Sequence, residues 1–380
     1  MSSTVKADHF VAVAREFAAA SVAPHAADWE RDRCAPRAVL EAAADVGLMG
    51  LLVPEALGGE GLDLVAMARI MEVLAAADLS FAFSVVVHNN LASNIARNGQ
   101  SHHQEAYLPD LIAGRRVGAF LLTEPQGGSD AANVRTMATR TASGWRIDGE
   151  KAWVTNGSHA DVLSIYAQTD TAARHRGIAC FLTAADMEGI ERLPAYHMLG
   201  GHALGAGGFR FTNLTLDERA CFLPPGKGFK AAMQGIDAAR VNVAFSVCGM
   251  LRHGIETTVG FLSNRSLFGT SNARKQGLQW LMADAASDLE AAYALSCKAA
   301  DALGSGDPEG TVLAAHAKKY ATRVAFDRLS DCMQAMGAWG LTHDHPVARH
   351  LAGAKIAQYL DGANEVQNVV IARSLFGDSA

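Results

Sequence analysis

Apolar residues at helical intervals dominate the first third of the chain. Residues 1–117 contain alanine-rich amphipathic stretches, such as Arg37–Leu51 and Leu64–Ala77. Proline and glycine residues separate these stretches, as expected of turns between helices. The pattern predicts an N-terminal α-helical domain whose apolar faces form a packed core.

The period of the apolar positions changes to two between residue 118 and about residue 225. Apolar and polar residues alternate over Leu163–Ala167, which is typical of a strand with one buried face. Trp145–Ile147 and Lys151–Val154 flank Asp148-Gly149, a dipeptide that favours a tight hairpin turn. We therefore predict a middle β domain over residues 118–225, with a hairpin turn at Asp148-Gly149.

Helical periodicity returns over residues 226–380. Long patterns run over Phe229–Leu262, Gln276–Leu303 and Thr311–Met336, with short breaks between them. Long helices joined by short turns predict an antiparallel bundle. The expected fold class is therefore an α+β multidomain protein, with an N-terminal helical domain, a β-barrel-like middle domain and a C-terminal four-helix bundle.

Composition narrows the classes of function. The 380 residues carry a net charge of −6, which argues against nonspecific nucleic-acid binding because that requires a broad basic surface. The apolar stretch Leu79–Val87 is too short to cross a membrane, and no signal peptide is recognisable, so we expect a cytoplasmic protein. His343 and His345 lack further ligands at a recognised spacing, and no metal site is predicted.

Two motifs in the middle domain suggest a site for a flat, anionic ligand. Phe120–Asp130 contains Pro125–Gly128, a tight turn whose backbone N–H groups can approach an anion or a ring closely. In Lys151–Gly157, strand alternation places Trp153 and Thr155 on one face, as an aromatic plane beside a hydroxyl. Each motif alone is more typical of an ordinary loop or of a half-buried tryptophan.

Charged residues in the C-terminal domain add two candidates. Arg265 lies in Arg265–Gly269, shortly before Gln276, and its planar guanidinium matches the geometry of phosphate. Asp237 and Arg240 are three residues apart and share one helix face. From the residues alone, a solvated ion pair is an equally good interpretation of the second pair.

The segment Gln358–Gln367 resembles the C-terminal signature of acyl-CoA dehydrogenases. Those flavoenzymes usually carry a glutamate before the glycine, whereas this chain carries Asp361. The other motifs resemble that family's elements in the same order, and Gln334–Gly340 is similar to its Gln-x-x-Gly-Gly-x-Gly element. The resemblance extends from about Ala14 to Arg373, and the chain is identified as a member of this family.

The resemblance implies FAD-dependent α,β-desaturation of an acyl-CoA thioester, with Asp361 as the base for the α-proton and flavin N5 as the hydride acceptor. It also implies electron-transfer flavoprotein as a partner and a homotetramer, a dimer of dimers in which a neighbouring subunit completes the FAD site. The implied FAD-binding residues are Phe120, Leu122, Thr123, Gly128, Ser129, Trp153, Val154, Thr155, Arg265, Phe268, Gln276, Gln334, Gly337, Ala338, Ala363 and Glu365. The implied substrate-binding residues are Ser129, Asp237, Arg240 and Gly362.

Several positions depart from the family's common pattern. Asp361 has about 1.5 Å less reach than glutamate, one carbon–carbon bond. Ala363 replaces a threonine, Ala352-Gly353 replaces an Arg-Asp pair, and Leu360 replaces a tyrosine. Two alternatives therefore stay open: a nitroalkane-oxidase-like flavoenzyme, which also uses aspartate, and a flavin- or acyl-CoA-binding homologue with little activity. If Asp361 is not the base, Glu365 is the next candidate.

Overall fold

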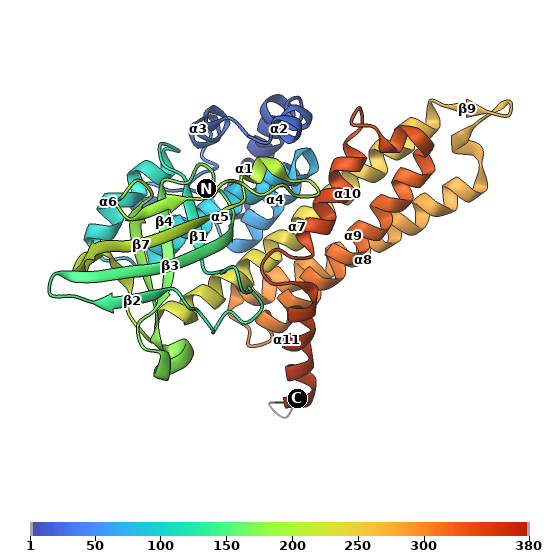
Figure 1. The fold of residues 1–380 in the computed structure, drawn as a ribbon. Coiled ribbons are helices and arrows are strands. Elements are labelled where there is room, and N and C mark those ends of the chain that lie inside the picture. The colour runs from blue at the N-terminus through green and yellow to red at the C-terminus, as the bar shows by residue number, and fades with distance from the viewer. Residues whose placement is uncertain (1–2, 378–380) are drawn as a thin grey trace.

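A computed structural model describes residues 3–377 and shows a sheet flanked in sequence by two helical regions (Figure 1). The N-terminal helices are α1 (Ser3–Phe17), α2 (Ala26–Asp32), α3 (Arg37–Asp45), α4 (Leu64–Ala77), α5 (Leu79–Asn98) and α6 (Ser101–Ile112). The main strands are β1 (Gly118–Leu121), β2 (Met137–Arg140), β3 (Gly144–Val154), β4 (Val162–Gln168), β5 (Ile178–Ala184), β6 (Ile190–Arg192), β7 (Gly207–Asp217) and β8 (Cys221–Leu223). The C-terminal elements are α7 (Gly228–Ser263), β9 (Ser266–Leu267), β10 (Thr270–Ser271), α8 (Gln276–Ser305), α9 (Gly310–Met336), α10 (Pro346–Ala357) and α11 (Asn364–Phe376). This order confirms the predicted fold class of helices, sheet and helices.

Helix α4 has the predicted bounds, and α3 does not. The Asp63 carboxylate accepts a hydrogen bond from the Ala66 N–H at 2.8 Å and so caps the start of α4. The prediction of one helix over Arg37–Leu51 was wrong, because α3 ends at Asp45. Leu48 and Leu51 lie in the turns that follow and are fully buried, so their apolar character reflects core packing of non-helical backbone.

The strands form one eight-stranded sheet in the order β6-β7-β3-β2-β4-β5-β8, with β1 paired in parallel to β4. The predicted hairpin turn at Asp148-Gly149 was wrong, because β3 runs through both residues with a register shift against β7. A side chain at position 149 would lie 2.7 Å from the Thr136 backbone, so glycine permits this close strand contact. The chain reverses instead between β2 and β3, where the Thr141 N–H bonds the Gly144 carbonyl at 2.9 Å.

Both faces of the sheet are covered near its centre. All seven residues of β4 are buried, so the predicted half-exposed alternation was wrong for this strand. One face packs with α5 in a core that includes Leu91, Ile95 and Tyr166. The other face forms a separate core around Ile165 and Phe209. Central strands covered on both sides need apolar or hydrogen-bonded residues at every position.

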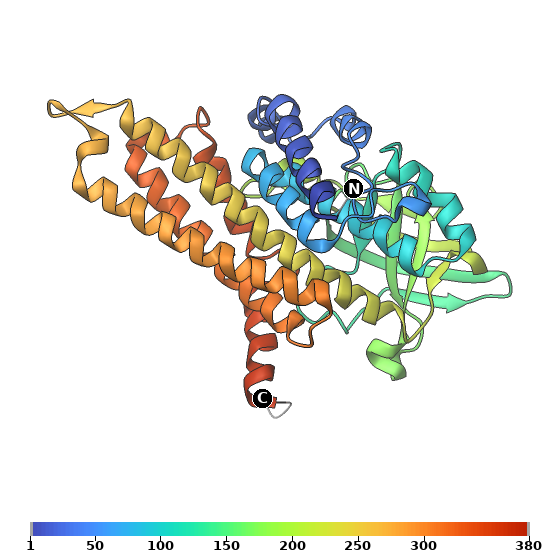
Figure 2. The same cartoon turned by 180° about the vertical axis from the view of Figure 1, so that it is seen from behind.

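The two helical regions share one hydrophobic core although the sheet separates them in sequence. This core contains residues of α1, α4 and α5 together with residues of α7, α8, α9 and α10. Figure 2 shows the N-terminal helices lying against α7, whose middle section is buried. No helix within residues 3–377 is both long and apolar enough to cross a membrane.

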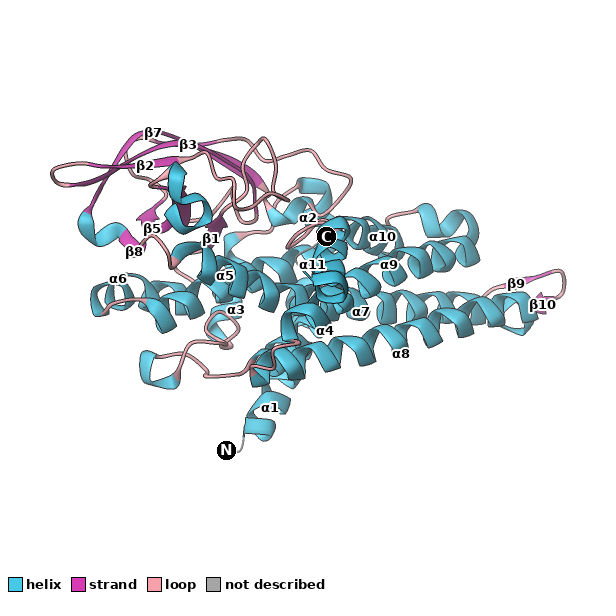
Figure 3. Cartoon of the chain, turned by 90° about the horizontal axis from the view of Figure 1, so that it is seen from below, coloured by secondary structure: helices cyan, strands magenta, loops and turns pink. Residues whose placement is uncertain are grey.

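Helices α7, α8, α9 and α10 form the predicted bundle (Figure 3). Its distal end carries the β9–β10 hairpin and a small cluster of Leu262, Met282, Cys332, Met336 and Val347. Helix α11 packs on α9 and extends away from the rest of the bundle (Figure 1). The turn between α10 and α11 therefore lies where α7, α9 and α11 meet.

Candidate active site

Asp361 lies in the turn that joins α10 to α11. Its φ angle is +50°, in the left-handed region, which aspartate tolerates better than most side chains. Gly362 follows with φ +92°, a conformation that strongly favours glycine. The backbone of this turn, rather than a regular element, therefore sets the direction of the Asp361 side chain.

The carboxylate of Asp361 lacks a partner within the described part of the chain. Its Oδ2 atom is buried and accepts no hydrogen bond. Burial raises the pKa of Asp361 to about 6, and the positive charges of Arg240 and Lys318 oppose this rise. A carboxylate with one buried, unbonded oxygen that is ionised at neutral pH is suited to accept a proton.

Hydrogen bonds from neighbouring side chains hold the backbone of this turn instead. Arg240 Nε donates to the Asp361 carbonyl at 3.1 Å, and Gln367 Nε2 donates to the Gly362 carbonyl at 2.9 Å. The Arg240 guanidinium also bonds the Asp237 carboxylate at 2.8 Å, with both side chains largely buried. The solvated ion pair considered for Asp237 and Arg240 is therefore wrong, because the pair packs beneath the turn.

Lys318, which sequence reasoning missed, bonds this turn through three hydrogen bonds, as many as Gln367 makes. Its ammonium donates to the carbonyls of Gln358 and Gly362 at 2.7 and 2.8 Å and to Asn364 Oδ1 at 3.0 Å. Lys318 is fully buried, and burial lowers its pKa to about 7. A detectable signal existed, since Lys318 shares the buried stripe of α9 with Ala314 and other small residues at helical spacing.

The Phe120–Ser129 segment is anchored by a second buried lysine. Lys151 Nζ donates to Glu124 Oε1 at 2.8 Å and to the Leu122 carbonyl at 2.9 Å. The Glu124 carboxylate also accepts hydrogen bonds from the backbone N–H groups that precede β2. These contacts fix one side of the segment and leave Gly128 and Ser129 exposed.

Trp153 and Thr155 lie at the end of β3, next to this segment. The Ala152 N–H bonds the Thr123 carbonyl at 2.9 Å, which brings the two motifs together. Trp153 has φ +57° and is 59% exposed, and its ring packs against Tyr196 with centroids 4.3 Å apart. The side chain is thus held at the surface, whereas Val154 is buried.

The remaining predicted residues gather at the far end of the bundle. Arg265 and Phe268 lie around the β9–β10 hairpin, which Figure 1 shows at the tip of the bundle. The Phe268 side chain is 97% exposed. Gln334, Gly337 and Ala338 are exposed where α9 ends. The structure therefore separates them from Asp361 within one chain.

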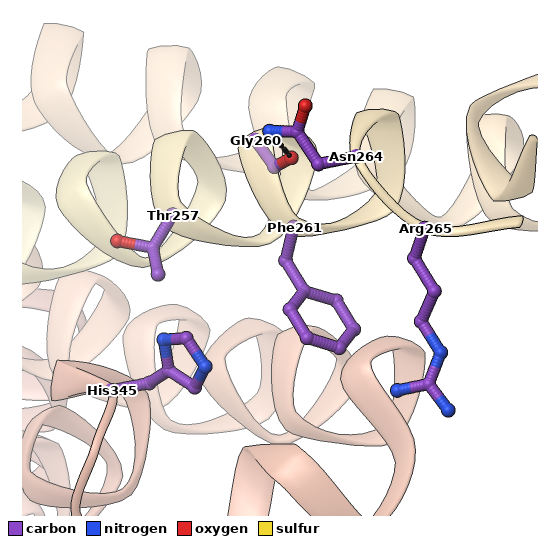
Figure 4. Close-up of a pocket in the computed structure, with 6 residues that line it drawn as sticks. All are labelled: Thr257, Gly260, Phe261, Asn264, Arg265 and His345. Atoms are coloured by element: carbon purple, nitrogen blue, oxygen red, sulfur yellow. Dashed lines mark hydrogen bonds between the residues drawn. The ribbon is translucent and has the colours of Figure 1, made fainter.

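A pocket of about 570 Å³ occupies this distal end (Figure 4). It lies between the last turns of α7 and the start of α10. Its lining residues are Thr257, Gly260, Phe261, Asn264, Arg265 and His345. The Arg265 guanidinium lies beside the Phe261 ring, 5.4 Å from its centroid. A cation and an aromatic face are thus presented together.

Family models cover the chain in three consecutive parts. The N-terminal, middle and C-terminal domain models of acyl-CoA dehydrogenase match residues 4–115, 119–214 and 226–376. The chain belongs to the acyl-CoA dehydrogenase family. The members of this family are oxidoreductases.

Individual relatives in the acyl-CoA dehydrogenase family match over nearly the whole length. The mitochondrial short-chain specific acyl-CoA dehydrogenase of Bos taurus is 31% identical, over 95% of this chain and 88% of its own. The structure of butyryl-CoA dehydrogenase from Megasphaera elsdenii superposes with a TM-score of 0.93 at 30% identity, covering 97% of this chain and 98% of that one. The structure of a glutaryl-CoA dehydrogenase from Mycobacterium smegmatis in complex with FADH2 superposes with a TM-score of 0.92 at 26% identity. The match covers 98% of this chain and 95% of that one.

Packing explains one departure from the pattern expected of an acyl-CoA dehydrogenase. A side chain at Gly353 would approach Met250 Cε to 2.8 Å and Leu79 to 3.2 Å. The expected aspartate does not fit there without movement, because α10 packs closely on α5 and α7 at this position. Leu360 packs against the main core, and Ala363 starts α11 without a side-chain cap.

Proposed function

We propose that this chain catalyses FAD-dependent α,β-dehydrogenation of an acyl-CoA thioester, with Asp361 as the base. The observation that carries the proposal is the buried, unbonded Oδ2 of Asp361 at the family's signature position. A carboxylate locked in an ion pair is a weaker base, whereas this one keeps its lone pairs available. Burial also raises its pKa to about 6, which increases its basicity while leaving it ionised at pH 7.

Asp361 takes the α-proton, and the electron pair of the broken Cα–H bond forms the new double bond. FAD, when bound, accepts the hydride that leaves the β-carbon. Arg240 and Gln367 keep the turn fixed during proton transfer, because both donate to its carbonyl groups. We assign Gly362 and Ser129 to substrate contact on the family resemblance.

The residues near Thr123 and Trp153 fit the ring system of FAD. Trp153 offers an exposed aromatic face, and the Thr155 hydroxyl follows two residues later. The exposed Gly127-Gly128 segment leaves room for close approach of a ligand to the backbone. We therefore propose that Phe120, Leu122, Thr123, Gly128, Ser129, Trp153, Val154, Thr155, Ala363 and Glu365 hold the flavin end of the cofactor.

We propose that the distal residues serve the cofactor of a neighbouring subunit. Arg265, Phe268, Gln276, Gln334, Gly337 and Ala338 lie at the distal end of the bundle, and most are exposed. Arginine beside an aromatic ring is suited to a pyrophosphate group. The expected assembly is a dimer of dimers, and light scattering should give the mass of four chains. A monomer with full FAD content would contradict this assignment.

Stopped-flow mixing under anaerobic conditions tests the reaction. Butyryl-CoA is a suitable first substrate, because relatives are named for short acyl chains. Asp361→Asn should slow flavin reduction by about 10²–10⁴-fold and leave FAD bound. Asp284→Asn, an exposed aspartate of the same bundle, is the control and should reduce normally. Retained activity in Asp361→Asn would overturn the assignment and direct attention to Glu365.

The partner and the alternatives are tested in the same experiments. Reduced enzyme should pass electrons to electron-transfer flavoprotein, and slow reoxidation by that protein would contradict the partner. Oxygen consumption with nitroalkanes, and none with acyl-CoA, would favour the nitroalkane-oxidase-like alternative. Tight acyl-CoA binding without flavin reduction across a broad panel would favour a homologue with little activity.

A further inference from the structure

Lys318 differs from an ordinary buried lysine in the chemistry of its partners. It lies inside α9, on the stripe that faces the core, and its side chain is fully buried. Burying an ammonium group is unfavourable unless its hydrogen bonds are satisfied. An apolar side chain of similar length would fill the same space without that penalty, so the charge needs another explanation.

The three acceptors of Lys318 match the three N–H donors of a protonated lysine. Two are the carbonyls of Gln358 and Gly362, and the third is Asn364 Oδ1. Along the chain they lie on both sides of Asp361, three residues before it and one and three residues after it. All three are neutral, so no ion pair consumes the positive charge.

The Asp361 carboxylate is the anion that this charge faces. The positive charges of Arg240 on α7 and Lys318 on α9 act on this carboxylate, and the exposed Glu365 of α11 acts on Lys318. Arg240 is already paired with Asp237 at 2.8 Å, which offsets its charge, whereas no carboxylate within residues 3–377 bonds Lys318. Lys318 therefore stabilises the ionised form of Asp361 without blocking either of its oxygens.

We propose that Lys318 is a positioning residue, which clamps the turn on both sides of Asp361 and keeps the carboxylate ionised while leaving it free to take a proton. The inference rests on the proposed role of Asp361 as the base. Two separable effects follow, since hydrogen bonds fix the turn and the charge favours the carboxylate.

Two substitutions at Lys318 separate these effects. Lys318→Met keeps the length and removes both charge and donors, and Lys318→Gln removes the charge but keeps two donors. Lys318→Met should slow flavin reduction by butyryl-CoA about 100-fold, as expected for loss of alignment near 1 Å. Lys318→Gln should slow it less. Lys319→Met, the neighbouring lysine whose side chain makes no hydrogen bond among the described residues, should leave the rate unchanged.

The pH profile provides a readout that loss of packing would not move. The rate of flavin reduction should rise with pH as Asp361 loses its proton. In both Lys318 variants this rising limb of the pH profile should shift to higher pH, because the cation that favours the ionised carboxylate is gone. Equal rates and an unmoved limb in Lys318→Met and Lys319→Met would overturn the proposal. If Lys318→Met does not fold, Lys318→Gln alone decides through the same limb.

A double-mutant cycle tests the coupling without catalysis. At pH 7, where Asp361 is ionised and Lys318 still carries part of its positive charge, Asp361→Asn should raise the melting temperature, and the rise should be larger in the Lys318→Met background. At pH 4 the two rises should be equal, because the carboxyl is then protonated. Equal rises at both pH values would overturn the proposed coupling. If Asp361→Asn still reduces flavin, the proposed function fails first; if only the Lys318 variants behave as wild type, this inference alone fails.

Discussion

Two buried lysines, Lys151 in the sheet and Lys318 in the bundle, treat a nearby carboxylate in opposite ways. Lys151 bonds Glu124 directly at 2.8 Å, and burial lowers its pKa to about 8 against the effect of that carboxylate. Glu124 additionally accepts hydrogen bonds from backbone N–H groups. Together with the Lys151 contact these outweigh the effect of burial and lower the pKa of Glu124 to about 2. Lys318 bonds only neutral oxygens, and the nearby Asp361 keeps a raised pKa.

The difference separates a structural charge from a reactive one. A carboxylate that is fully bonded to a lysine and to N–H groups is held as an anion and cannot act as a base near neutral pH. Asp361 lies near a lysine whose hydrogen bonds go to other groups. The positive charge of that lysine stabilises the ionised carboxylate, and the carboxylate oxygens stay free to accept a proton. The partner's hydrogen bonds, rather than the presence of a charge nearby, therefore decide which role the carboxylate has.

Removing Lys151 should have the largest effect on stability. Lys151→Met leaves Glu124 as a buried carboxylate without its counter-charge, and the free energy of unfolding should fall by about 3–5 kcal/mol. Urea unfolding measures this. Lys298→Met, at an exposed site on α8, should change it by less than about 0.5 kcal/mol. Similar values for both variants would remove the distinction between the paired lysine and a surface lysine.

Neutralising Asp361 should increase the free energy of unfolding, whereas removing Lys151 should decrease it. The raised pKa of Asp361 means that the folded protein holds this proton more tightly than the unfolded chain, so the benefit exists at low pH and is lost as pH rises through about 6. Asp361→Asn should therefore stabilise the fold by about 1–3 kcal/mol at pH 8 and have little effect at pH 4. Denaturant unfolding at the two pH values measures the change. Destabilisation at pH 8 would mean that the carboxylate is bonded after all.

Gly362→Ala should have a smaller effect on the same turn. Alanine at φ +92° is strained, and the expected loss is about 1–2 kcal/mol, with slower flavin reduction because Asp361 shifts. Gly304→Ala, in a helical and open position of α8, is the matched control and should stabilise the protein slightly. Chemical unfolding and stopped-flow reduction measure both variants. If Gly362→Ala changed neither the free energy of unfolding nor the rate of flavin reduction, the turn would have to accommodate the added methyl group without strain.

Thr311→Val should have the smallest effect. The Thr311 hydroxyl donates to Asp237 Oδ2 at 2.7 Å at the edge of the Arg240 pair. Because the site is exposed and water can replace the hydroxyl, the loss of unfolding free energy should be about 0.5 kcal/mol. Thermal unfolding measures it. A loss as large as that of Gly362→Ala would extend the clamp around Asp361 to Thr311.

The sequence predicted the elements whose periodicity is strong. Helices α7, α8 and α9 begin and end within about two residues of the predicted patterns, because long apolar stripes define them. It failed where tertiary contacts overrode local signals. The Asp148-Gly149 pair forms an irregular section of a strand that packs on Thr136, and β4 is buried on both faces by α5 and by the other strands.

For the site, motifs located Asp361 but could not show what holds it. The partner lysine lies 43 residues earlier in sequence, and its acceptors are mostly backbone carbonyls, which are identical in every residue. Contacts of that kind leave no pattern of side chains to recognise. The burial of Asp237 and Arg240 was likewise invisible, because i, i+3 spacing is equally typical of exposed pairs.

The core shared by the first and last helical regions has a consequence for synthesis of the chain. The apolar faces of α4 and α5 pack against α7, which begins 130 residues after α5 ends. Until α7 has been synthesised, the apolar faces of the N-terminal helices remain exposed and prone to aggregation. Biogenesis of this protein should therefore depend on chaperones that shield its first hundred residues while the sheet is being translated.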